Sequence, residues 1–304
     1  MSDYQRYLDP EVVNKVSPLD LKARLVVEGF ISGLHKSPHR GFSVEFAEYR
    51  EYVPGDDVRH IDWKVFAKTD RHYIKQYEEE TNLVSHVLLD LSESMQYGSG
   101  SVTKQDYAST IAAALIYLVI QQQDAVGLGL FDEKVRKFMP AGSHHGHMRQ
   151  LLREIAEAEP QAKTDISGVI HDLSERIRKR GLVIVISDFL DDPEKILQAI
   201  QVLRHRRHDV IVMHVLDEYE VDFPFDSMTR FVGLEAAGER IANPRALRKA
   251  YLAELESYLE AIKTGCHSAG VDYVRMTTNQ RLDVALSAYL ATRSSIRKAK
   301  SQRQ

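Results

Sequence analysis

Short apolar runs separated by amphipathic segments are the feature that most constrains the fold. The runs VIVIS at 183–187 and VIVMHV at 210–215 are almost continuously apolar, as strands buried on both faces are. Between such runs lie segments of helical periodicity, such as 104–122, in which Ala108 and Ile111 share a face. This alternation predicts an α/β fold with a doubly wound, mostly parallel sheet that helices cover on both faces.

Turn signals and apolar periodicity predict the elements along the chain. Strands are expected at 84–91, 125–131, 135–140, 181–189, 209–217 and 271–278, with a hairpin at 230–242. Helices are expected at about 20–34, 104–122, 146–157, 166–180, 193–206, 244–268 and 281–293. We therefore expect an N-terminal α+β layer packed on the core at 1–82, an α/β domain with a C-terminal extension at 83–293, and a basic frayed tail at 294–304.

Composition argues against several classes of protein. The chain has 304 residues, 43% hydrophobic content and a formal net charge of -4, which gives no overall attraction to nucleic acid or anionic membranes. Cys266 is the only cysteine, so no internal disulfide is expected and a reducing compartment is favoured. The N-terminus lacks the apolar core of a signal peptide, and the longest apolar run, IAAALIYLVI, is shorter than the roughly 20 residues of a spanning helix. We expect a cytoplasmic protein without membrane insertion.

Oxygen-bearing side chains follow several of the expected strands. The stretch VLLDLSESMQYGSG places Asp90, Ser92 and Ser94 on alternate residues where a buried strand ends. Thr164 lies in the loop AKTD before a helix, and Asp188 follows the buried run VIVIS. Because ligands of open parallel sheets bind at the carboxyl ends of the strands, we expect these five side chains to converge on one edge.

Such a set of side chains suits a hard divalent cation. Mg²⁺ takes six oxygen ligands, often keeps several waters and needs only one or two carboxylates, and Mn²⁺ accepts similar donors. The lack of Cys and His in the set argues against zinc or copper. Neutral hydroxyl ligands would leave the ion able to accept a further carboxylate from a partner. For isolated Ser and Asp residues the alternative is helix or turn capping, but the five positions together favour a metal.

The segment EFAEYREYVPGDDVRHIDWKVFAKTDRHYIKQYEEE closely resembles the signature of the DUF58 family. The resemblance continues through DLSESMQYGS to ISDFLDD and DVIVMHVLD. Members of this family carry a von Willebrand factor A-like domain, whose metal-ion-dependent adhesion site (MIDAS) the pattern Asp-x-Ser-x-Ser resembles. The resemblance implies Asp90, Ser92 and Ser94 as the first metal loop, Thr164 as the second and Asp188 as the third. Many A domains have Thr-Asp-Gly in the third loop, where this chain has Ser-Asp-Phe.

The resemblance also implies a function. DUF58 proteins often occur beside MoxR-type AAA+ ATPases and are thought to act with them in protein maturation or assembly. We therefore expect a non-enzymatic, Mg²⁺-dependent adaptor that binds such an ATPase and no nucleic acid. The signature region holds charged and aromatic side chains that form either a docking surface or a turn whose charges pair with one another. These are Arg50, Asp56, Asp57, Arg59, Asp62 and Trp63.

The alternative function is a metal-dependent hydrolase or phosphatase that uses the same crevice, with Asp90 as the nucleophile. Phosphatases of the haloacid dehalogenase type place a second Asp two residues later, where this chain has Ser92. No Gly-x4-Gly-Lys-Ser/Thr phosphate loop is present either. A third interpretation is a degenerate site kept as a scaffold. His144, His145 and His147 are expected to begin a helix rather than to bind a transition metal.

Overall fold

The computed structural model of the chain describes residues 13, 19–36, 49–51, 66, 71, 73–75, 83–160, 166–233 and 238–301. The chain forms two compact units, residues 1–33 with 82–304 and residues 34–81. In the second unit, β1 (Tyr49–Glu51) and β2 (Tyr73–Lys75) pair antiparallel. The central sheet and the candidate site lie in the first unit.

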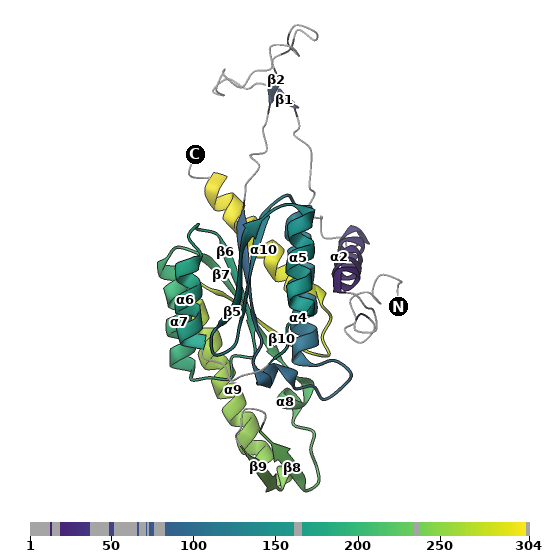
Figure 1. Cartoon of the computed structure of the whole chain (residues 1–304), viewed down its shortest axis with the longest axis vertical. Coiled ribbons are helices and arrows are strands. Elements are labelled where there is room, and N and C mark those ends of the chain that lie inside the picture. The colour runs from purple at the N-terminus through teal and green to yellow at the C-terminus, as the bar shows by residue number, and fades with distance from the viewer. Residues whose placement is uncertain are drawn as a thin grey trace. The chain divides into compact units, whose positions relative to one another are not determined.

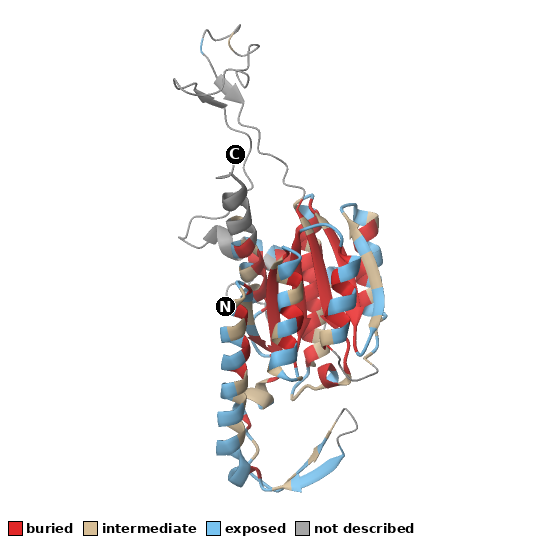
Figure 2. Ribbon diagram, turned by 90° about the vertical axis from the view of Figure 1, so that its left-hand side faces the viewer, coloured by how far each residue is buried: buried red, intermediate tan, exposed pale blue. Residues whose placement is uncertain are grey.

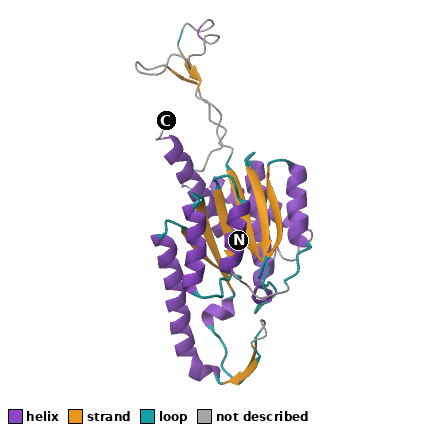
Figure 3. Ribbon diagram, turned by 60° about the vertical axis from the view of Figure 1, so that its left-hand side comes forward, coloured by secondary structure: helices purple, strands orange, loops and turns teal. Residues whose placement is uncertain are grey.

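A six-stranded sheet in the order β10-β7-β6-β3-β4-β5 forms the centre of the first unit (Figures 1 and 3). Its strands are β3 (Val84–Asp90), β4 (Ala125–Phe131), β5 (Val135–Gly142), β6 (Leu182–Ser187), β7 (Asp209–Leu216) and β10 (Asp272–Thr277). All neighbouring strands pair parallel except β5, which is an antiparallel edge strand beside β4. The predicted doubly wound, mostly parallel α/β sheet is confirmed.

Helices cover both faces of this sheet, as the apolar strands require. On one face lie α6 (Ile166–Arg176) and α7 (Pro193–His205), with α9 (Pro244–Ser268) packed against α7 and β10. On the other face lie α4 (Lys104–Gln121) and α5 (His145–Ala156), with α10 (Asp283–Ser301) packed against α4. The N-terminal α2 (Leu19–Lys36) also belongs in part to this unit and buries Ala23, Val26, Val27 and Phe30.

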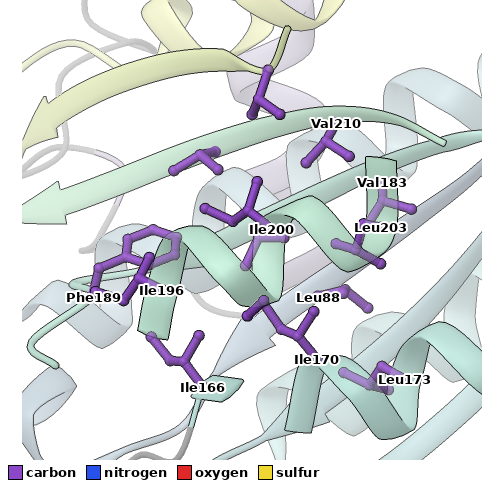
Figure 4. Packing of buried hydrophobic residues seen from close by; sticks show 14 of the residues in the cluster. Leu88, Ile166, Ile170, Leu173, Val183, Phe189, Ile196, Ile200, Leu203 and Val210 are labelled. Carbon is purple, nitrogen blue, oxygen red and sulfur yellow. The ribbon is translucent and has the colours of Figure 1, made fainter. Parts of the chain in front are cut away.

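The core between the sheet and the α6–α7 face is formed by branched aliphatic side chains from consecutive strand–helix units (Figure 4). Leu88 of β3, Val183 of β6 and Val210 of β7 meet Ile170 of α6 and Ile200 of α7 there, all 2% exposed or less. The strands of the sheet are buried along most of their length (Figure 2). On the opposite face, α4 is apolar around most of its circumference, and 13 of its 18 residues are buried. A helix that is hydrophobic on all sides is stable only when other elements surround it.

Several boundaries differ from the predicted ones. α10 continues to Ser301, although we expected the segment from residue 294 to fray. Its Arg, Lys and Ala residues are good helix formers, and positive charge near a helix C-terminus is favourable. α6 ends at Arg176 rather than near residue 180. The chain then turns into β6 at Gly181, where a Cβ would lie 2.0 Å from the carbonyl oxygen of Val84. The described helices include none with the length and apolar content of a membrane span.

Two short elements were not predicted. The 3-10 helix η3 (Glu93–Gln96) follows β3, and α8 (Glu218–Asp222) follows β7. The predicted hairpin is present as β8 (Thr229–Val232) and β9 (Glu239–Ala242), which pair antiparallel ahead of α9. Both α8 and this hairpin lie at the end of the sheet where β3, β6 and β7 finish (Figure 1).

Candidate metal centre

The sheet has its topological switch point between β3 and β6. From β3 the chain first crosses to β4 and β5 on one side, and later fills β6, β7 and β10 on the other. The helices that follow neighbouring strands therefore diverge there and leave room at the carboxyl ends, which is where open α/β sheets bind ligands. Asp90 is the last residue of β3, and Asp188 follows the last residue of β6.

The first loop folds back on Asp90. The backbone N–H of Ser92 donates to Oδ1 of Asp90 at 2.8 Å, which turns the chain directly after the strand. The hydroxyls of Ser92 and Ser94 lie 3.0 Å apart. Ser92 is fully buried and Ser94 is 6% exposed, so the surrounding chain holds both hydroxyls close to the carboxyl group.

The third loop joins the first through Ser187. Its hydroxyl donates to Oδ2 of Asp90 at 2.6 Å and accepts the N–H of Phe189 at 2.9 Å. Phe189 has a φ of 49°, in the left-handed region that glycine adopts without strain. The Phe at this position thus keeps a glycine-like turn, while its buried ring packs in the core. The carboxylate of Asp188 remains at the sheet edge, 1% exposed.

A buried lysine that the sequence analysis did not identify completes this edge. Lys104, the first residue of α4, is fully buried, and its Nζ lies 2.8 Å from Oδ2 of Asp188 and 2.7 Å from Oε1 of Glu220 in α8. Burial alone would lower the pKa of Lys104, but the carboxylates of Asp188 and Glu220 outweigh it and raise that pKa. Lys104 is therefore a fixed positive charge at the centre.

The electrostatic environment of Asp90 favours a further cation in this cluster. Burial, together with the negative charge of Asp188, raises the pKa of Asp90 to about 7, even though Ser187 and Ser92 donate hydrogen bonds to it. A second positive charge beside Asp90 would offset this penalty. Two acids and two hydroxyls, all oxygen donors, fit Mg²⁺ or Mn²⁺ with water in the remaining positions.

Not every predicted site residue can be placed. Thr164 lies outside the described residues, as do Asp56, Asp57, Arg59, Asp62 and Trp63. Arg50 is in β1, opposite Ile74 of β2. The described part of the chain thus brings together four of the five predicted metal ligands. It contains no group of three or more His, Cys, Asp or Glu side chains that could hold an ion without hydroxyls.

The histidine cluster is a helix start. The ring of His144 accepts the N–H of His147 and so caps α5, and Nε2 of His147 lies 2.9 Å from the carbonyl oxygen of Val126. Both rings are thereby occupied with backbone groups. Cys266 is buried, and burial raises the pKa of its thiol to about 12, which leaves it unreactive near neutral pH.

The fold and this edge define a class of protein: a doubly wound α/β domain with a hydroxyl-rich acidic centre at its switch point. The chain belongs to the DUF58 family, described as "Protein of unknown function DUF58", whose pattern it matches over residues 48–258. An uncharacterized protein of Mycobacterium tuberculosis, Rv1480, is 30% identical over 219 residues, which span 71% of this chain and 68% of that protein. The Bacillus subtilis protein YeaD is 22% identical over 156 residues, 51% of this chain and 37% of its own length.

The solved structures that are similar to this chain include those of BatB and of the SpRpn10 VWA domain. BatB of Bacteroides thetaiotaomicron gives a TM-score of 0.49 at 16% identity, covering 72% of this chain and 99% of that one. The SpRpn10 VWA domain gives a TM-score of 0.42 at 12% identity, covering 68% and 94%.

Proposed function

We propose that this chain is a non-enzymatic adaptor that binds a partner protein through a Mg²⁺-dependent centre. The observation that carries the proposal is the convergence of Asp90, Ser92, Ser94 and Asp188, all 6% exposed or less, at the switch point of the sheet. A VWA-like fold in a DUF58 protein favours a role in protein interaction.

The chemistry follows from the kinds of donor. Ser92 and Ser94 would offer neutral hydroxyls, and Asp90 would offer a carboxylate whose charge is spread by its hydrogen bonds from Ser187 and Ser92. An ion held there would supply an electrophilic position that accepts an Asp or Glu carboxylate of the partner. Lys104 already neutralises part of the charge of Asp188, which leaves the centre less anionic toward an incoming acid.

The partner we propose is a MoxR-type AAA+ ATPase, as the family resemblance implies, with ATP hydrolysis belonging to that partner. Assembly or maturation of a protein complex is the corresponding process. The residues of the signature region, among them Arg50 and Trp63, would add contacts outside the centre.

The second candidate is a metal-dependent hydrolase in which Asp90 attacks a substrate. The position of Asp90 at the end of β3 favours this function. Against it, the residue two positions later is Ser92, a serine that cannot act as a carboxylic general acid.

Pull-down from cell extract, with Mg²⁺ or with a chelator, tests the proposal. Wild-type protein should capture the ATPase only with Mg²⁺, and Asp90→Asn should abolish this capture while the fold persists. The matched control is Asp132→Asn, because Asp132 is an equally buried acid beyond the end of β4 that pairs instead with Arg136. Capture that persists in chelator would contradict metal bridging and favour the scaffold. Loss of a phosphatase turnover in Asp90→Asn would favour the hydrolase.

A further inference from the structure

An aromatic cavity adjoins the metal centre. Its volume is about 400 Å³, within the lower range of protein ligand pockets and sufficient for a large side chain. At one end it is lined by Ser94, Lys104 and Leu190, which belong to the loops of the candidate centre or contact them. Tyr97 and the acid Glu220, which pairs with Lys104, also line it. At the other end it is lined by rings and one aliphatic side chain from α8, the segment after α8, β8 and α9: Tyr219, Phe223, Phe225, Phe231, Val232 and Tyr251.

The rings form one connected cluster. Phe223 lies 4.5 Å from Tyr251 and 5.1 Å from Phe225 between ring centroids, and Phe225 lies 5.4 Å from Phe231 in an edge-to-face arrangement. Such contacts fix the positions of the rings. The hydroxyl of Tyr251 also donates to the carbonyl of Glu220 at 2.9 Å. The wall of the cavity is therefore ordered before any partner arrives.

The mouth of the cavity is apolar and accessible. Val232 is 54% exposed, Leu190 is 49% exposed and Tyr219 is 39% exposed. Figure 2 shows the hairpin and the first half of α9 as largely exposed ribbon. Exposed apolar side chains that gather around a preformed cavity are typical of interaction sites.

Charge on the elements that carry the aromatic wall favours an acidic occupant. The described residues of the hairpin and of the first two turns of α9 include one exposed acid, Glu239, which pairs with Arg230 at 3.5 Å, and five exposed cations: Arg230, Arg240, Arg245, Arg248 and Lys249. Of these cations, Arg248 donates to the carbonyl oxygen of Phe223 in the cavity wall. The acids Glu218, Asp222 and Asp226 lie in α8 and in the segment after it. The hairpin and α9 therefore form the side of the cavity that attracts an acidic segment.

We propose that the cavity binds an aromatic or large aliphatic side chain of the partner, adjacent in sequence to the Asp or Glu that reaches the metal centre. This inference rests on the proposed function and names the peptide chemistry that the same site selects. Ser94 lines the cavity and is also a candidate metal ligand, so the two subsites share a residue and one short segment spans both. The preferred motif is an acid followed or preceded within two residues by a bulky apolar residue.

Fluorescence anisotropy with three labelled hexapeptides tests the motif: Gly-Ser-Asp-Trp-Ser-Gly, Gly-Ser-Asp-Ala-Ser-Gly and Gly-Ser-Asn-Trp-Ser-Gly. In Mg²⁺, the first should bind the full chain about tenfold to a hundredfold more tightly than the second, the effect of burying one large apolar side chain. In Mg²⁺, the Asn-Trp peptide should bind far more weakly than the Asp-Trp peptide. In chelator, all three peptides should bind far more weakly than the Asp-Trp peptide does in Mg²⁺. Equal binding of the Asp-Trp and Asp-Ala peptides would overturn the inference and leave the proposed function standing. Chelator-insensitive binding that does not need the Asp would contradict the proposed function itself.

Tyr219→Ala provides an independent measurement. Tyr219 lies at the mouth with an accessible side chain, so its removal should leave the fold intact, as a thermal midpoint would show. The variant should lose the preference for the Asp-Trp peptide. The matched control is Val284→Ala, since Val284 is 38% exposed but lies in α10. If both variants keep the full preference, the cavity is not the apolar subsite.

Discussion

The ammonium of Lys104 lies 2.8 Å from Oδ2 of Asp188, and both side chains are buried, at 0% and 1% exposed. The pair joins the start of α4 to the end of β6 and contributes a positive charge where the candidate metal ligands meet. A buried pair of this kind is costly to break, because the remaining charge has no water to solvate it.

Lys104→Met should therefore destabilise the metal-free protein by about 3–5 kcal/mol. The loss of stability should be smaller in Mg²⁺, because a bound cation compensates the charge of the Asp188 carboxylate that the substitution leaves unpaired. Urea unfolding with and without Mg²⁺ measures both values. Lys263→Met is the control, since the Lys263–Glu260 pair has a similar distance of 2.9 Å but is exposed and should contribute little. An equal loss in both conditions would contradict a metal beside Asp188.

Ser92→Ala and Ser94→Ala should each lower Mg²⁺ affinity by about tenfold or more, because each removes one oxygen donor from a buried centre. Isothermal titration calorimetry measures this affinity. Ser174→Ala is the control, since Ser174 is also buried but its hydroxyl donates to the carbonyl of His171. Affinities that match the wild-type value would show that the hydroxyls only brace the loop.

Phe189→Gly should destabilise the protein although it removes backbone strain. Relief of the left-handed conformation is worth about 1–2 kcal/mol, whereas removing a buried Phe side chain costs about 3–5 kcal/mol. Arg207→Gly should instead stabilise the protein. Arg207 follows the C-cap of α7 with a φ of 64°, and its side chain is exposed, so the substitution relieves backbone strain without removing core packing. A gain of about 0.5–1 kcal/mol is expected there. Chemical denaturation of both variants checks the two signs, and a loss in Arg207→Gly would contradict the strain argument.

His86 should lower the free energy of unfolding at acidic pH. Burial, aided by the charge of His208, lowers the pKa of His86 to about 4, so the folded state resists a proton that the unfolded chain accepts near pH 6.5. Stability should fall as the pH drops below about 6.5, by about 2–3 kcal/mol at pH 4.5 from this residue alone. His86→Leu should flatten that slope in urea unfolding measured at pH 7 and pH 4.5. An unchanged slope would place the acid sensitivity elsewhere.

Much of the sheet could be predicted, because strands buried on both faces have nearly continuous apolar sequences and their helices show clear periodicity. The bounds of α9 agree with the predicted 244–268, since Asn243 and Pro244 form a recognisable helix start. The convergence of Asp90 and Asp188 was likewise predictable, because parallel strands bring their carboxyl ends to one edge.

Other parts of the centre depend on tertiary contacts that no local pattern reports. The Thr103–Asp106 capping box indicates that α4 begins near Lys104, but not that the Lys104 side chain turns inward toward β6. Glu220 looks like a capping residue of a short helix, and it does cap α8 through Asp217. Only the position of α8 beside the start of α4 in the folded chain makes Glu220 a second partner for Lys104.

The antiparallel β5 has a consequence for self-association. An open sheet edge is a template for pairing with a second copy, and natural proteins blunt such edges with charge, proline and irregular pairing. β5 has all three, with exposed Arg136 and Lys137, Pro140, and two interruptions in its register with β4. Fibre-like stacking through this border is thereby disfavoured.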